Sequence, residues 1–124
     1  MIWKVEATDL FWDWLQGQDE PLRLDMLAAL RLLAEEGPLL GRPFVDTLAF
    51  SVLPNMKELR VQSKGRPIRA FFVFDPLRHA IILCAGNKQG KDQKRFYKKM
   101  LHITAQQYHK HLNLIEKKCN ENIR

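Results

Sequence analysis

The sequence has few cysteines and no long apolar run, and both absences limit what the protein can be. Cys84 and Cys119 provide neither a disulfide framework nor the spacing of a metal site. No apolar stretch approaches the roughly 20 residues of a membrane-spanning helix. The N-terminus turns polar at once, unlike a signal peptide. We therefore expect a cytoplasmic protein without membrane association, in which Cys84 is a small buried apolar residue.

Motifs for common enzyme chemistries are also missing. The chain has no glycine-rich phosphate loop, no metal-ligand cluster and no signature of a serine or cysteine nucleophile. His109 and His111 are close in sequence, but a spacing of two points them to different faces of a helix. We expect both to be exposed. The sequence thus predicts neither a metal nor a cofactor.

What the chain does have is a strong division of charge. Residues 1–62 carry six Lys or Arg against ten Asp or Glu, whereas residues 63–124 carry fourteen against four. The cations are concentrated in segment 86–99, where they are interleaved with Phe96 and Tyr97. Cations attract phosphates and aromatic rings stack bases. RNA is therefore the first partner that the sequence suggests.

The first third of the chain predicts a short strand and two helices. The strand covers 2–6, Thr8 or Asp9 caps the first helix, and Asp19 caps the second. Because the connection between the helices is short, we expect an antiparallel helical hairpin. A loop over 38–43 follows.

The rest of the chain predicts a small sheet and a final helix. Three strand-like runs over 57–62, 68–74 and 79–85 have short connections, which favour an antiparallel meander. A helix over about 92–118 follows, with a break expected near 102–104. The sequence therefore predicts one α+β domain over 1–118 and a frayed tail over 119–124.

Arg69 stands out because it is charged inside an otherwise apolar strand. An unpaired buried charge is costly. Arg69 therefore either pairs with a carboxylate such as Glu58 or Asp75, or presents its guanidinium to a phosphate on a concave sheet face. If the strands pair across the 63–67 turn, Arg60 lies on the same face. Two adjacent like charges favour an anion between them.

Seven short motifs together resemble a known family. They are Gly41-Arg42-Pro43, Asp46-Thr47-Leu48, Asn55-Met56-Lys57-Glu58-Leu59-Arg60, Ile68-Arg69-Ala70-Phe71-Phe72, Phe74-Asp75-Pro76, Gly86-Asn87-Lys88 and Lys94-Arg95-Phe96-Tyr97. Their order and spacing resemble the phage-derived HigB-like branch of the RelE/ParE toxin superfamily over about residues 1–115. The resemblance implies a RelE-like fold, with an N-terminal helical hairpin on a small antiparallel sheet and a C-terminal helix.

The resemblance also implies an activity. Such proteins are toxins of type II toxin–antitoxin pairs and most often endoribonucleases that cut mRNA in the ribosomal A site and arrest growth. They need no metal, because the ribose 2′-hydroxyl attacks the neighbouring phosphate while the protein stabilises charge and manages protons. The expected partners are mRNA, the ribosome and a cognate antitoxin with a helix-turn-helix DNA-binding domain.

Site residues follow from the matching positions. The resemblance implies a catalytic set of Arg60, Arg69, Lys88 and Tyr97. The residues expected to bind RNA are Lys57, Arg66, Lys91, Lys94 and Arg95. Glu58 departs from the pattern, since some members carry a lysine there, and a carboxylate repels phosphate unless it accepts a proton.

Two other functions stay open at the level of sequence. One is a non-catalytic, ParE-like inhibitor of DNA gyrase, which shares the fold without the basic site. The other is a small RNA-binding module without chemistry. Arg60, Arg69 and Lys88 favour the nuclease over the gyrase inhibitor.

Overall fold

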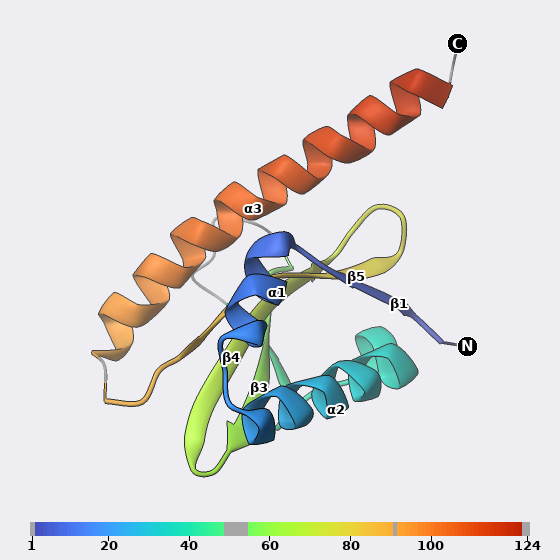
Figure 1. Ribbon diagram of the computed structural model, residues 1–124. Helices are drawn as coiled ribbons and strands as arrows, with labels where there is room; N and C mark the ends of the chain where they lie inside the picture. The colour runs from blue at the N-terminus through green and yellow to red at the C-terminus, as the bar shows by residue number, and fades with distance from the viewer. Residues whose placement is uncertain (1, 49–54, 91, 123–124) are drawn as a thin grey trace.

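The computed structural model describes residues 2–48, 55–90 and 92–122, and side chains through residue 118. The elements in chain order are β1 (Lys4–Ala7), α1 (Asp9–Gln16), α2 (Glu20–Glu36), the short 3-10 helix η1 (Gly37–Leu39), β2 (Val45–Thr47), β3 (Lys57–Ser63), β4 (Arg66–Phe74), β5 (His79–Asn87) and α3 (Gln93–Asn122). Figure 1 shows the sheet between α3 on one side and α2 on the other. The α+β class and the RelE-like arrangement predicted from sequence are confirmed.

The five strands lie in the order β1-β5-β4-β3-β2. The antiparallel meander of β3, β4 and β5 forms as predicted. The expectation of a wholly antiparallel sheet is wrong, because β1 pairs parallel to β5. No tight hairpin joins β1 to its neighbour, so no local turn fixes its direction. The sequence also missed β2, whose three residues are too few to show a period.

Side chains from the two faces of the sheet form separate cores. On one face, α1 and α2 pack against alternating residues of the strands, including Leu59, Ala70 and Ile82. The opposite face packs against α3, whose Phe96 and Met100 contact β4 and β5. This alternation follows from the period of two in a strand. It places every second residue of β3 and β4 on the side of the sheet that α3 occupies.

The predicted helix starts are confirmed. The Thr8 hydroxyl accepts a hydrogen bond from the Phe11 amide at 3.1 Å, and Asp19 Oδ1 accepts one from the Leu22 amide at 3.0 Å. Each satisfies an N–H that the helix leaves unpaired. Gly37 ends α2 with a positive φ of 58°, where an added Cβ would collide with the Trp3 ring.

The long helix α3 differs from its prediction in two ways. It has no break near 102–104, because Thr104 is buried within the helix and donates its hydroxyl to the Met100 carbonyl at 2.6 Å. His111 is not a free surface residue either, because its Nε2 lies 2.9 Å from the buried Asp75 Oδ2 in the β4–β5 turn. His109 is exposed as predicted.

An irregularity in β5 alters the pairing with β4. Phe72 pairs with Ile82, but Phe71 pairs with Cys84, so Leu83 is an extra residue in β5. Such a bulge changes the local direction of side chains. Here Leu83 and Cys84, neighbours in sequence, both pack on the side of the sheet that α3 covers. Cys84 is buried and free, as predicted, whereas the side chain of Cys119 lies outside the described residues.

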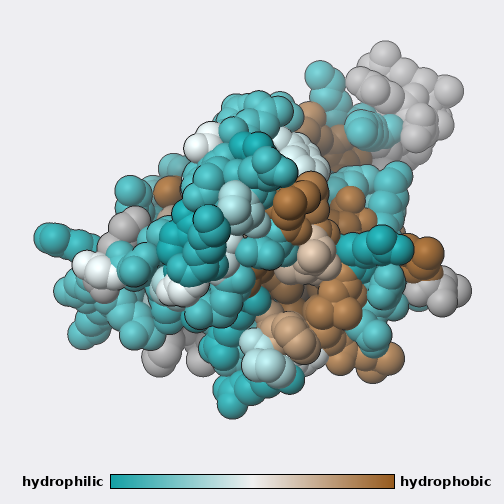
Figure 2. All heavy atoms as spheres, turned by 60° about the horizontal axis from the view of Figure 1, so that its bottom comes forward, coloured by the Kyte–Doolittle hydropathy of each residue, from teal (hydrophilic) through white to brown (hydrophobic). Residues whose placement is uncertain are grey.

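Apolar surface is not spread evenly. Figure 2 shows hydrophobic side chains gathered toward one side of the face it presents, beside a broad hydrophilic surface. Exposed large apolar side chains of the N-terminal third are Ile2, Leu10, Trp12, Leu24, Leu27 and Leu39. None of the described helices is both long and apolar enough to cross a membrane.

Candidate active site

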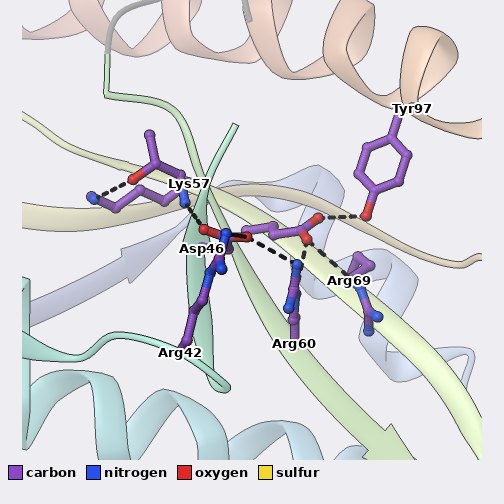
Figure 3. A network of polar contacts seen from close by, with 8 residues as sticks. Arg42, Asp46, Lys57, Arg60, Arg69 and Tyr97 are labelled. Atoms are coloured by element: carbon purple, nitrogen blue, oxygen red, sulfur yellow. Dashed lines mark hydrogen bonds and ion pairs between the residues drawn. The ribbon is translucent and has the colours of Figure 1, made fainter. Parts of the chain in front are cut away.

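A buried carboxylate is the centre of the candidate site. Glu58, on β3, faces α3 and is 2% exposed. Its Oε1 accepts a hydrogen bond from Arg60 Nε at 3.0 Å, and its Oε2 accepts one from the Tyr97 hydroxyl at 2.6 Å. Figure 3 shows the tyrosine reaching down from α3 and the arginine lying along the sheet. A charge this deeply buried needs such partners.

Two guanidinium groups lie on the same face. Arg60 and Arg69 are directly opposite each other in the β3–β4 ladder, as the strand pairing predicted. The anion between them is the carboxylate of Glu58. Arg69 Nε is 3.9 Å from Glu58 Oε1, which is too long for a hydrogen bond.

The Nε group of Arg69 is an unusual donor. Arg69 Nη1 donates to the Ile68 carbonyl at 3.0 Å, but Nε is buried without a hydrogen-bond partner among the described residues. Buried polar groups nearly always have a partner, so an unpaired one calls for an explanation. This N–H lies on the α3 side of the sheet, 3.9 Å from Glu58 Oε1.

An ammonium group completes the set of cations. Lys88 follows the last residue of β5, and its Nζ lies 5.7 Å from the centre of the Tyr97 ring. Burial, and next the positive charge of Arg69, lower the pKa of Lys88 below its ordinary value. Lys88 therefore releases a proton more easily than an exposed lysine.

The pKa of Tyr97 is shifted in the opposite direction from that of Lys88. Burial and the hydrogen bond to Glu58 raise the pKa of Tyr97 to about 12, although the Arg69 guanidinium acts in the other direction. At neutral pH the phenol is therefore protonated and donates its hydrogen. Arg60, Arg69, Lys88 and Tyr97 thus converge around one carboxylate.

A second acidic residue extends the network to β2. Asp46 Oδ2 lies 3.1 Å from Arg60 Nη2 and 3.1 Å from Arg42 Nη2. The hydrogen bond from Arg42 lowers the pKa of Asp46, so this carboxylate stays charged. Figure 3 shows Arg42, Asp46 and Arg60 side by side at the margin of the site. Asp46 therefore helps to hold Arg60 in place.

The comparisons with known proteins now identify the family. Residues 13–109 match the family described as "Phage derived protein Gp49-like (DUF891)". The chain belongs to the Gp49-like family. The HigB-like branch that the sequence motifs indicated is thereby confirmed.

Two relatives of this Gp49-like chain come from Mycobacterium tuberculosis. The protein named "Putative toxin HigB2" is 43% identical over 104 residues, which cover 83% of this chain and 51% of that protein. The protein named "Putative toxin HigB3" is 42% identical over 93 residues, covering 75% of this chain and 79% of that protein. The Gp49-like chain thus spans about half the length of HigB2 and most of HigB3.

The residues expected to bind RNA are more scattered in this Gp49-like chain. Lys57 alternates away from Glu58, and its Nζ bonds to Thr47 Oγ1 at 3.0 Å. Arg66 is paired with Asp19 through contacts of 2.7 and 3.0 Å at the start of β4. Lys94 and Arg95 are exposed in the first turn of α3, and Lys91 lies outside the described residues.

Glu58 is the residue that the sequence-based catalytic set left out. The sequence suggested it as a partner of Arg69, but its position in the motif was treated as a departure, because a carboxylate repels phosphate unless it accepts a proton. The signal that could have found it is the strand register, which brings Arg60 and Arg69 together and demands a counter-charge beside them. In the part of the chain that the structure describes, no group of three or more His, Cys, Asp or Glu side chains could hold a metal ion.

Proposed function

We propose that this Gp49-like chain is the toxin of a type II toxin–antitoxin pair and cleaves mRNA on the ribosome without a metal. The observation that carries the nuclease proposal is the buried Nε of Arg69, a donor without a partner among the described residues, with Arg60 opposite and Lys88 nearby. An RNA phosphate that displaces Glu58 from the guanidinium supplies the acceptor that this donor lacks. Guanidinium groups bind phosphate by paired, charge-assisted hydrogen bonds.

In the proposed reaction the ribose 2′-oxygen attacks the adjacent phosphorus. A bond forms between the 2′-oxygen and phosphorus, and the bond from phosphorus to the 5′-oxygen breaks. The products are a 2′,3′-cyclic phosphate and a free 5′-hydroxyl. Arg60 and Arg69 stabilise the extra negative charge on the phosphoryl oxygens in the transition state, where such fixed donors have their largest effect.

Protons are handled by Glu58 and Lys88. Glu58 accepts the proton of the 2′-hydroxyl, and Lys88, whose pKa is lowered, donates one to the 5′-oxygen. The Tyr97 hydroxyl holds the Glu58 carboxylate in position. A bound phosphate competes with Glu58 for the two guanidinium groups. RNA binding therefore weakens the contacts of the arginines with the Glu58 carboxylate at the step in which this carboxylate must accept a proton.

Surface charge supports an RNA-rich target. The first two turns of α3 present Lys94, Arg95, Lys98 and Lys99, which are all exposed. Residues 63–124 as a whole carry fourteen cations against four anions. Such a surface attracts the phosphates of ribosomal RNA, over a distance that shortens as the ionic strength of the solution rises. Family membership implies an antitoxin, and we propose that it carries a helix-turn-helix domain.

Expression of this chain without its antitoxin tests the proposal. We expect growth arrest together with new 5′ ends inside translated mRNAs. Arg69→Ala and Lys88→Ala should abolish both effects, while Arg31→Ala, which alters an exposed pair with Glu35 on α2, should abolish neither. Full toxicity of both site variants would exclude the nuclease. Broken DNA in place of cut mRNA would indicate gyrase poisoning, and arrest without cleavage would indicate an RNA-binding module.

A further inference from the structure

A groove lies apart from the contacts of Glu58, between α1, the end of β5 and the start of α3. It has a volume of about 680 Å³, within the range of cavities that bind ligands. One wall is formed by Leu10 and Trp14 of α1, and the other by Phe96 and Ile103 of α3. Its floor is the stretch of β5 from Cys84 to Asn87.

The floor of the groove is an open edge of the sheet. The neighbour of β5 on this side is β1, which ends at Ala7 opposite Ile82. The chain then makes its last contacts with β5 through Thr8, whose amide donates to the Ile82 carbonyl at 3.0 Å and whose hydroxyl donates to the Leu83 carbonyl at 2.8 Å. Beyond Leu83, no strand in the described part of the chain covers this edge.

The ladder with β4 shows which backbone groups face the groove. The Lys88 amide donates to the Pro67 carbonyl at 3.1 Å, and Gly86 pairs with Arg69. In an antiparallel pair, alternate residues point their N–H and C=O groups toward the partner strand. Ala85 and Asn87 therefore point theirs away from β4, into the groove. No backbone partner for these groups is found among the described residues.

The walls of the groove define the chemistry of its occupant. Leu10, which is 42% exposed, and Trp14 make the α1 wall apolar. On the α3 wall, Arg95 and Lys99 are one helical turn apart and both exposed, and they outnumber the Asp92 carboxylate, whose Oδ1 accepts hydrogen bonds from the helix's first amides. An extended peptide would direct alternate side chains toward the two walls. It would place apolar side chains against α1 and acidic ones beside Arg95 and Lys99.

We propose that an acidic, apolar segment of the antitoxin adds to the sheet as a strand along Ala85 and Asn87. Addition of a strand to an open edge is a general mode of peptide recognition, in which the backbone gives affinity and the walls give specificity. The inference rests on the proposed function only in requiring an antitoxin. Tyr97 and Lys99 lie on opposite sides of Phe96 around α3, so the strand occupies a different surface from the Glu58 site.

Amide hydrogen exchange tests the strand directly. The probe is the product of the adjacent gene that suppresses growth arrest, added to the full-length Arg69→Ala chain. In the free chain we expect the amides of Ala85 and Asn87 to exchange about tenfold faster than that of Gly86, and to become protected in the complex. Amides of Ala85 and Asn87 that are already protected in the free chain, or that the antitoxin leaves unchanged, would overturn the inference.

Matched substitutions test the walls. Lys99→Glu and Leu10→Glu should each weaken antitoxin binding about tenfold or more. Lys98→Glu, next to Lys99 but outside the groove, and Leu24→Glu, on α2, should bind as the parent does. Unchanged thermal unfolding shows that a variant is folded. If folded Lys99→Glu binds the antitoxin as the parent does, the proposed binding of the antitoxin in the groove is wrong, and the nuclease proposal is unaffected. If Arg69→Ala is toxic and still binds the antitoxin, only the nuclease proposal is wrong.

Discussion

The hydroxyl of Tyr97, in the second turn of α3, donates a 2.6 Å hydrogen bond to the carboxylate of Glu58, in β3. This contact joins the C-terminal helix to the part of the sheet that carries Arg60 and Arg69. The tyrosine therefore holds the carboxylate that lies between Arg60 and Arg69. Any shift of the start of α3 alters how firmly that carboxylate is held.

Removal of this hydroxyl should slow cleavage. We expect Tyr97→Phe to reduce the single-turnover rate on programmed ribosomes about 100-fold, because Glu58 loses the donor that positions it. Tyr108→Phe, on the same helix but in a different cluster, is the matched control and should cut at the parent rate. Equal cleavage rates for the two variants would show that Tyr97 contributes to packing and does not position Glu58 for cleavage.

Replacement of Arg69 by lysine should not restore function. Lysine keeps the charge but lacks the planar set of donors that a guanidinium presents to phosphate. We expect Arg69→Lys to lose about 100-fold in cleavage rate and Arg69→Ala about 1000-fold, without a change in product ends. Rates measured with RNA bound at saturation separate this loss from weaker binding. A fully active Arg69→Lys variant would mean that charge alone is sufficient.

Acid should destabilise the contact between α2 and the β3–β4 hairpin. The hydrogen bond from Arg66, with that from the Leu22 amide, lowers the pKa of Asp19 to about 2 from an ordinary 3.8. Between about pH 4 and pH 2, the Asp19 carboxylate binds a proton more readily in the unfolded chain than in the folded one. The stability that Asp19 contributes is therefore lost as the pH falls through this range.

Asp19→Asn tests this contact, because asparagine still caps the helix but cannot pair with Arg66 as an anion. We expect the variant to be less stable at neutral pH and its unfolding midpoint in urea to change less between pH 4 and pH 2. Asp25→Asn, at an exposed position of the same helix, is the control. An acid response identical to the parent's would contradict the assignment.

The contact between His111 and Asp75 should stabilise the distal half of α3. Burial alone would raise the pKa of Asp75, but the His111 ring and the amides of His79 and Leu77 outweigh it and lower the pKa. We expect His111→Ala to lower the free energy of unfolding by about 1–3 kcal/mol, because a buried carboxylate loses a partner. Urea unfolding measures this.

His109→Ala provides the control for that measurement. His109 is exposed on the same helix, and substitution there should change the free energy of unfolding by less than about 0.5 kcal/mol. Equal effects at the two positions would mean that helix propensity, and not the contact with Asp75, determines the loss.

Local chemistry explains which parts of the fold the sequence could predict. Thr8 and Asp19 mark helix starts by their side-chain oxygens, and the short turns after Ser63 and Phe74 determine the meander. The direction of β1 and the existence of β2 depend on pairing with distant strands. No local pattern reports such pairing.

The candidate site likewise contains residues that the sequence could predict and contacts that it could not. Arg69 was identifiable because a charge in an apolar strand needs a reason, and its pairing with Arg60 followed from the turn between them. The sequence also suggested Glu58 as a partner of Arg69, but not its contact with Tyr97, which is 39 residues away in sequence. Likewise, nothing near His111 in the sequence indicates Asp75 in the turn before β5.

The extra residue in β5 has a consequence for how this strand tolerates changes of length. Phe72 pairs with Ile82 and Phe71 with Cys84, so Leu83 has no partner residue in β4. Its side chain instead fills the space shared with Met56 and Val73, beneath Leu101 of α3. A chain shortened by Leu83 would therefore keep the rest of the ladder but leave a gap beneath Leu101, so the packing of this part of α3 depends on a residue that the sheet itself does not require.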